Sequence, residues 1–124
     1  MAIAVQTIVD GPRNAILKLV NDTGAAETAA LKVDVSALSP ATSSVRIDRA
    51  SVSVTGGVGD SASLLWDATA DKEIISFPAG DSQYYDFRMF GGLVNDAGAG
   101  VTGDIRLTSS TGVTYTITLW LVKR

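Results

Sequence analysis

Carboxylates are the main side chains in this sequence that could carry acid–base catalysis, because the chain has neither histidine nor cysteine. Serine–histidine and cysteine–histidine nucleophiles are therefore excluded. A carboxylate pair could still serve as general acid and base, as in glycoside hydrolysis. The candidates lie near predicted turns: Asp67, Asp71, Glu73, Asp81 and Asp86. Aspartate is common at turns because it accepts hydrogen bonds from local N–H groups, so we predict no catalytic residue and a non-enzymatic protein.

Aspartates at turns could also bind calcium, which takes oxygen ligands. Asp67 and Asp71 lie four residues apart in one predicted turn. The further candidates are Asp60, Asp96 and Asp104. None of these positions has the spacing of an EF-hand loop. We therefore predict neither a metal site nor a cofactor.

The glycine-rich segment Gly91–Gly103 is the longest predicted loop. It lacks the Gly-Lys-Ser/Thr ending of a phosphate-binding loop and precedes a strand, whereas phosphate-binding loops open helices. A loop of this length in a compact domain is often functional. We predict an adaptable surface loop and no nucleotide site.

The length and composition of the chain indicate how many domains it forms and which classes of partner are disfavoured. Its 124 residues form one predicted domain, residues 1–124. The net charge is −3 and the basic residues form no stripe, which argues against a nucleic-acid partner. No apolar run approaches the ~20 residues that span a bilayer, so we predict no membrane partner. Charged residues make up 19% of the chain, below the ~25% typical of soluble domains. Subunit contacts would explain this low fraction, and so would a tight, valine-rich β domain.

Period-two alternation indicates that the chain is all-β. In Thr114–Leu121, Tyr115 and the leucines and isoleucine fall on one face, and the threonines and Trp120 fall on the other. Strands are predicted at 6–10, 13–21, 27–35, 44–54, 63–67, 73–77, 83–87, 104–109 and 112–123. A short helix over Ala25–Ala30 competes with the third strand. This spacing favours a single antiparallel β-sandwich, jelly-roll-like, with an immunoglobulin-like sandwich as the alternative.

Three details of the strands are open to test. The apolar phase of 44–54 changes midway, which predicts a β-bulge near Asp48–Arg49 or a strand that passes between the sheets. In 27–35 the alternation places Leu31 and Val33 inward and Lys32 outward. The last two strands are predicted to pair as a hairpin.

Several apolar residues have no evident partner within the fold. Trp120 lies on the threonine face, where it either packs under a neighbouring loop or enters an intersubunit contact. Residues 1–5 form an apolar N-terminal arm suited to strand exchange with a neighbour. The segment Arg88–Phe90 enters the long loop with a large aromatic residue and could anchor a partner. The predicted interface residues are Ala2, Ile3, Ala4, Val5, Phe90, Leu93, Val94 and Trp120.

The order of short motifs along the chain resembles that of small all-β virion proteins of tailed bacteriophages. The motifs are Val9–Asn14 (VDGPRN), Leu65–Thr69 (LWDAT), Phe90–Asn95 (FGGLVN), Gly98–Ile105 (GAGVTGDI) and a final strand that closes on Val122–Arg124. They cover most of the chain, and they are turn and loop patterns without a diagnostic active site. Within this group the chain is most similar to capsid decoration (cement) proteins.

The resemblance implies a mechanical function. Decoration proteins bind the outside of the expanded head, commonly as trimers, and bridge neighbouring capsomers. The implied partners are the major capsid protein or other virion proteins and further copies of the chain, and the implied location is the virion, assembled in the host bacterial cytoplasm. Many weak contacts repeated over a shell give a large collective stabilisation.

Three alternatives to capsid decoration remain open from the sequence. The protein could be a tail, neck or fibre component of the virion. It could be a carbohydrate- or cell-surface-binding module, in which Trp66, Tyr84, Tyr85 and Trp120 form an aromatic platform. It could also be a glycosidase-like enzyme or an inhibitor domain built on the carboxylates named above.

Overall fold

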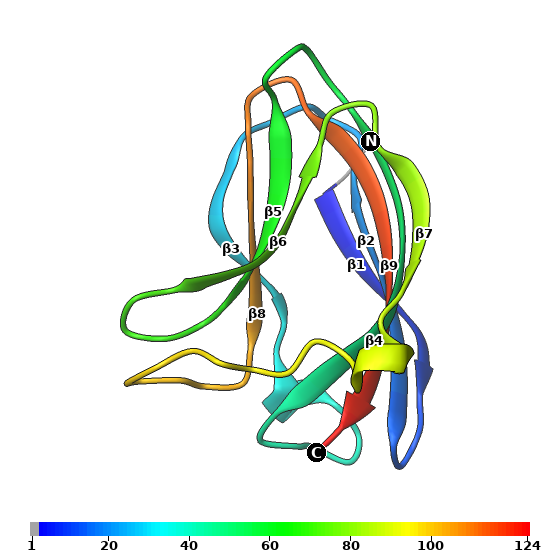
Figure 1. Ribbon diagram of the computed structural model, residues 1–124, viewed down its shortest axis with the longest axis vertical. Coiled ribbons are helices and arrows are strands. Elements are labelled where there is room, and N and C mark those ends of the chain that lie inside the picture. Colours follow the sequence, from blue (N-terminus) through cyan, green and yellow to red (C-terminus); the bar gives the residue numbers. More distant parts are fainter. Residues whose placement is uncertain (1–2) are drawn as a thin grey trace.

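A computed structural model describes residues 3–124 and is all-β, as predicted (Figure 1). The strands of this described part are β1 (Ile3–Asp10), β2 (Asn14–Asn21), β3 (Glu27–Val33), β4 (Val45–Thr55), β5 (Ser61–Trp66), β6 (Lys72–Pro78), β7 (Ser82–Asp86), β8 (Ile105–Ser109) and β9 (Thr114–Lys123). Two single-turn 3-10 helices are η1 (Val35–Ala37) and η2 (Arg88–Phe90). Within residues 3–124, no helix is long and apolar enough to cross a membrane.

The strands form two antiparallel sheets that face each other (Figure 1). One sheet has the order β1-β2-β9-β4-β7 and the other has the order β3-β8-β5-β6. Four strand pairs lie one inside the next, as in one long folded hairpin: β5·β6, β4·β7, β3·β8 and β2·β9. Two further pairs, β4·β9 and β5·β8, join these strands into two sheets. This is the jelly-roll topology, and the immunoglobulin-like alternative is not observed.

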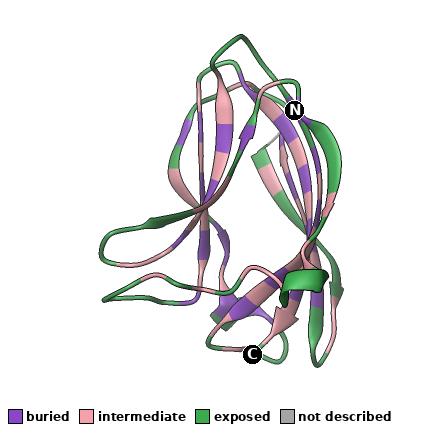
Figure 2. Ribbon diagram, in the orientation of Figure 1, coloured by how far each residue is buried: buried purple, intermediate pink, exposed green. Residues whose placement is uncertain are grey.

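The core lies between the two sheets and follows the alternation of each strand (Figure 2). In β9, Tyr115, Ile117, Leu119 and Leu121 are buried, as the sequence predicts. Trp66 is among the largest buried side chains and is only 1% exposed. Burial of apolar area stabilises a fold by roughly 25 cal/mol per Å², so these rows of inward side chains hold the sandwich together.

The predicted bulge in β4 is confirmed. Ile47 pairs with Leu121 and Arg49 pairs with Trp120, which leaves Asp48 as the extra residue. The strand stays within the five-stranded sheet, so it does not pass between the sheets. Because the bulge resets the phase, Ile47 and Ala50 can both face the core while Arg49 faces outward.

The third strand differs from the prediction in which of its residues are buried. It is a strand and not a helix, but its register with β8 shifts twice, and Ala29 adopts a left-handed φ of 45°. These irregularities turn Leu31 outward, where it is 45% exposed, and Lys32 inward, where it is 7% exposed. Strict alternation therefore gives the wrong faces for these two residues.

The buried lysine belongs to a polar cluster at one end of the core. Glu27, itself 7% exposed, forms an ion pair with the Lys32 ammonium. The Tyr115 hydroxyl and the Asn21 amide both donate to the Glu27 carboxylate. Burial, followed by the Glu27 hydrogen bond, raises the pKa of Tyr115 far above its ordinary value. Glu27, Lys32, Tyr115 and Asn21 thus partner one another, as a low-dielectric interior requires of polar side chains.

The predicted hairpin between the last two strands is wrong. β8 belongs to the four-stranded sheet and β9 to the five-stranded sheet, so the turn between them crosses from one layer to the other. The reason is that β9 uses both of its edges, one for β2 and the other for β4. No edge of β9 is left for β8, which pairs with β3 and β5 instead.

The predicted N-terminal arm is also wrong for the residues that the structure describes. β1 begins at Ile3, and Ile3, Ala4 and Val5 pair in register with Asn21, Val20 and Leu19 of β2. Ala2 lies outside the described residues. A tight turn joins the two strands, with the Gly11 N–H donating to the Asn14 carbonyl at 2.8 Å. The apolar start of the chain is thus an edge strand of the same molecule.

Candidate interaction surface

A single row of side chains crosses the outer face of the five-stranded sheet, the face turned away from the core. Each residue is paired with the next across neighbouring strands. From β1 to β7 the row is Val9, Ile16, Trp120, Arg49 and Asp86. Directly paired residues project from the same face of a sheet. The row is therefore apolar and aromatic on one side and charged on the other.

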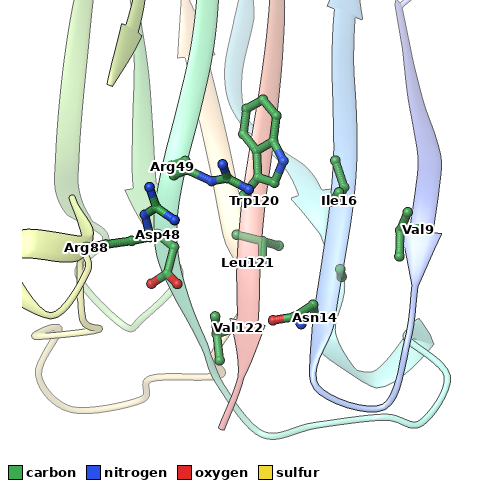
Figure 3. A pocket seen from close by; sticks show the side chains of 10 residues that line it. Val9, Asn14, Ile16, Asp48, Arg49, Arg88, Trp120, Leu121 and Val122 are labelled. Atoms are coloured by element: carbon green, nitrogen blue, oxygen red, sulfur yellow. The ribbon is translucent and has the colours of Figure 1, made fainter. Parts of the chain in front are cut away.

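This row borders a shallow hollow of about 320 Å³ (Figure 3). Apolar side chains from β1, β2 and β9 line one side, and Asp48, Arg49 and Arg88 line the other. Figure 3 shows the Arg49 side chain reaching toward the Trp120 ring at the upper end of the hollow, with Asn14 and Val122 at the lower end. Such a mixed surface suits a protein contact with an apolar centre and a charged rim.

Trp120 is held in place by neighbouring strands and not by a covering loop. The Arg49 guanidinium carbon lies 5.0 Å from the centre of the indole ring. The Tyr84 ring meets the indole edge-on, with centroids 6.0 Å apart and an interplanar angle of 87°. Arg49 also donates to the Tyr84 hydroxyl at 3.4 Å. This arrangement gives Trp120 a fixed orientation on an open surface.

The helix η2 holds two large apolar side chains in solvent beside the hollow. Met89 is 89% exposed and Phe90 is 81% exposed. The preceding Asp86 carboxylate fixes the turn, because it accepts from the Arg88 backbone N–H, from Nε at 2.9 Å and from Nη2 at 2.6 Å. These hydrogen bonds from Arg88 lower the pKa of Asp86 to about 2. The prediction that Phe90 is available to a partner thus stands, and Met89 lies beside it.

The segment after η2 is pinned to β4. Leu93 forms a two-way backbone bridge with Ile47, its N–H donating at 2.8 Å and its carbonyl accepting at 3.1 Å. Gly92 lies so close that a Cβ there would sit 2.4 Å from Arg46 Cγ, and its φ is +83°. Only glycine fits this position without strain. Leu93 is half-buried and packs against the core, whereas Val94 is 49% exposed, and the interface role predicted for both stays a prediction.

The residues predicted for the interface do not all share one face. Ala4 lies on the outer face with Trp120, because it pairs with outward-facing Val20. Ile3 and Val5 lie on the other face, since Val5 pairs with buried Leu19. They remain 42% and 39% exposed. The first strand therefore presents apolar side chains on both faces.

Four of the five candidate catalytic carboxylates make structural contacts, namely Asp67, Asp71, Asp81 and Asp86. Asp67 accepts from the Thr102 hydroxyl and from Arg106, and these bonds lower its pKa. Together they tie the 91–103 loop to the turn after β5, and the two segments run side by side (Figure 1). Asp81 accepts from the Tyr85 hydroxyl at 2.6 Å, which raises the pKa of Tyr85.

The calcium hypothesis gains no support from the geometry. The Asp71 carboxylate accepts from the Ala68 backbone N–H at 3.1 Å, which is a turn contact. Among residues 3–124, no group of three or more acidic side chains converges as a metal site would require.

The aromatic platform proposed for sugar binding does not form as predicted. Trp66 is in the core. The Tyr85 ring stacks on Phe87 at 6.0 Å and an interplanar angle of 4°, and it packs against the core cluster. Only Tyr84 and Trp120 of the four face outward, and Arg49 covers part of the indole. The platform is thereby reduced to two rings.

Sequence reasoning missed Arg49 as a member of this surface. The predicted bulge already signalled that β4 turns a residue outward near Arg49. The local pattern could not show that β4 lies next to β9, since it carries no information on the order of strands in a sheet. Arg88 and Met89 precede the predicted anchor Phe90, and their exposure depends on the single turn of η2.

No protein-family model matches this chain, and no curated protein matches it at a significant level.

Proposed function

We propose that this protein is a non-enzymatic structural component of a tailed-phage virion that decorates the capsid. In this role it binds the outer surface of the expanded head, bridges neighbouring capsomers and stabilises the shell. Its contact surface is the outer face of the five-stranded sheet together with η2. The partners are the major capsid protein or other virion proteins and further copies of the chain.

The observation that carries this proposal is the combination of a rigid hollow with two exposed apolar side chains beside it. Trp120, fixed by Arg49 and Tyr84, resembles the aromatic and arginine residues that dominate binding energy in protein interfaces. Met89 and Phe90 protrude from η2, whose Arg88 lines the hollow and is held by Asp86. A surface already ordered before binding loses little conformational entropy when a partner docks.

The fold supports the proposal by analogy alone. Double-sheet jelly rolls occur in viral capsid proteins and also in lectins and cupins, so the architecture is compatible with more than one function. The order of turn motifs along the chain favours the virion proteins among these. The two outward aromatic rings leave sugar binding as the competing function.

Quantitative mass spectrometry of purified virions tests the proposal. We expect a copy number equal to that of the major coat protein or a simple fraction of it. A few copies per particle would assign the protein to the neck, tail or fibres. Complete absence from virions would overturn the proposal, and binding to a glycan array would then favour the carbohydrate-binding alternative.

A second measurement tests the proposed surface. Purified shells that lack the protein are mixed with wild type, with Trp120→Ala or with Phe90→Ala, and the bound fraction is measured after sedimentation. We expect both variants to bind at least about tenfold more weakly, which corresponds to 1.4 kcal/mol. Val58→Ala is the matched control, because Val58 is fully exposed in the β4–β5 turn and lies away from the hollow. Equal binding by all four proteins would exclude this face as the contact.

A further inference from the structure

The two sheets end in four edge strands, and three of them carry features that oppose pairing with another chain. β3 has two register shifts and places Glu27 and Lys32 along its length. β6 begins with Lys72 and Glu73 and ends at Pro78. β7 is only five residues long. Natural sheets use bulges, charges, proline and short strands in this way to keep exposed edges from associating.

The fourth edge, β1, lacks most of this protection. It has eight residues, and no charged residue occurs between Ile3 and Val9. Its one bulge falls at Ile8, after Thr7 and before Val9. The segment 3–7 is therefore a regular, uncharged strand whose outer edge has no paired strand in the molecule.

Both faces of this edge strand are also exposed. Among the described elements, β1 packs extensively on β2 alone. Ile3, Val5, Ile8 and Val9 are between 39% and 54% exposed. Figure 2 shows β1 as largely exposed, in contrast to the central strands of the same sheet. An exposed apolar edge of this kind is a site for strand addition.

We propose that β1 pairs antiparallel with β1 of a second copy of this chain, across a two-fold axis near Val5. The two five-stranded sheets then join into one continuous ten-stranded sheet. An axis at the midpoint of segment 3–7 places Val5 opposite its own copy and Ile3 opposite Thr7. A two-fold contact of this kind uses the same surface on both copies and closes without forming a fibre.

Charge is the reason to choose a second copy as the partner. In this register no charged residue of segment 3–9 faces its copy, because the segment has none. Asp10, the only charge on β1, lies beyond the end of the paired segment and is already neutralised by Lys123 at 2.6 Å. The same self-pairing at β6 would bring lysine and glutamate side chains into the new ladder. Of these two edges, only β1 is compatible with its own copy in this respect.

The first test compares two identical substitutions on the two edges of one sheet. Gln6 on β1 and Gln83 on β7 are both exposed. We expect sedimentation equilibrium of the wild type to show a mass moving from 12.9 kDa toward twice that value as concentration rises. Gln6→Glu should weaken the dimer at least about tenfold, because it adds like charges near the axis. Gln83→Glu should leave the dimer unchanged. Neither variant should lower the melting temperature of the monomer, since residue 6 pairs with Lys18 on β2 and a glutamate there meets an opposite charge.

The second test locates the contact directly. The chain has no native cysteine, so single-cysteine variants give unambiguous crosslinks. Val5→Cys should form a disulfide-linked dimer on mild oxidation, whereas Tyr84→Cys on the opposite edge should stay monomeric. A wild-type protein that is monomeric throughout, or a trimer that survives Gln6→Glu, would overturn the proposal. Both tests use purified protein alone, so their outcome is independent of the proposed place in the virion.

Discussion

Two clusters in this protein combine the same kinds of side chain but have different roles. The buried cluster combines Glu27, Lys32 and Tyr115 between the sheets. The surface cluster combines Arg49, Trp120 and Tyr84 on the outer face. In each of them a cation and an aromatic residue are held in a fixed geometry, with an acid in contact or close by.

The difference between the clusters is their access to water. Removing one member of the buried set leaves a charge or a hydroxyl without a partner in a medium of low dielectric, which is costly. Removing one member of the surface set exposes the rest to water, which replaces the lost contacts. The buried cluster therefore governs stability, and the surface cluster is free to serve binding. Four experiments test whether stability depends on the buried cluster and binding on the surface cluster.

The largest effect is expected for Glu27→Ala. This change leaves the Lys32 ammonium buried without its carboxylate and should lower the free energy of unfolding by about 3–5 kcal/mol. Urea denaturation followed by tryptophan fluorescence measures the loss. Glu73→Ala, at an exposed position of β6, is the matched control for a general loss of acidic charge. A loss below about 1 kcal/mol for Glu27→Ala would contradict the buried role of this cluster.

Tyr115→Phe should have a smaller effect of the same kind. It removes a hydroxyl that donates to Glu27 and should cost about 1–3 kcal/mol. Because burial and then Glu27 raise the pKa of Tyr115, its contribution is fully present below its ordinary pKa of 10.0 and lost as pH rises above that value. Denaturation at neutral pH and above pH 10.0 should show the two proteins converging in stability. A constant gap across this range would refute the linkage.

Trp120→Ala should separate stability from assembly. The loss of the edge contact with Tyr84 and of the stack with Arg49 should lower stability by only about 1–2 kcal/mol. Its effect on shell binding should be larger than its effect on the isolated fold. Thermal melting of the purified protein and the shell-binding assay measure the two quantities. Equal losses in both would show that Trp120 serves the fold and not the contact.

The smallest effect concerns the acid response of η2. The Arg88 hydrogen bonds lower the pKa of Asp86 to about 2, from an ordinary 3.8. A lowered pKa means that the contact stabilises the turn above pH 3.8 and is lost as pH falls through about 2. We expect the amide resonances of Met89 and Phe90 to shift in that acid range while those of the core strands stay constant. Asp86→Asn should remove this titration, and an unchanged response in that variant would assign it to another group.

The sequence was sufficient for the architecture and for much of the core. Period-two alternation identified the nine strands, and a change of phase identified the bulge at Asp48 in β4. Strict alternation gave the wrong faces for Leu31 and Lys32, because the register shifts of β3 leave no mark in the pattern of apolar residues. The buried lysine is stabilised by Glu27 from the same strand, a contact that only the bulged geometry creates.

The candidate surface was predicted only in fragments. Trp120 was recognised because it breaks a run of threonines, and Phe90 because it opens a loop. Arg49 could not be connected to Trp120, since their pairing depends on β9 lying between β2 and β4. The pairing of residues 3–5 with β2 could not be predicted for the same reason, since no local pattern in 3–5 specifies the neighbouring strand.

The position of β9 also bears on how the protein folds. This strand follows all the others along the chain, yet it lies in the middle of its sheet, where its Val122 pairs with Asn14 of β2. During synthesis, β2 and β4 have no strand between them until β9 has left the ribosome. Proteins dominated by such distant contacts fold slowly, because the entropy of closing long loops is lost before the contacts form. The five-stranded sheet is therefore completed only after translation of residues 114–123. Until then the apolar inner faces of β2 and β4 lack the strand that joins them, and such transiently exposed surface is prone to aggregation.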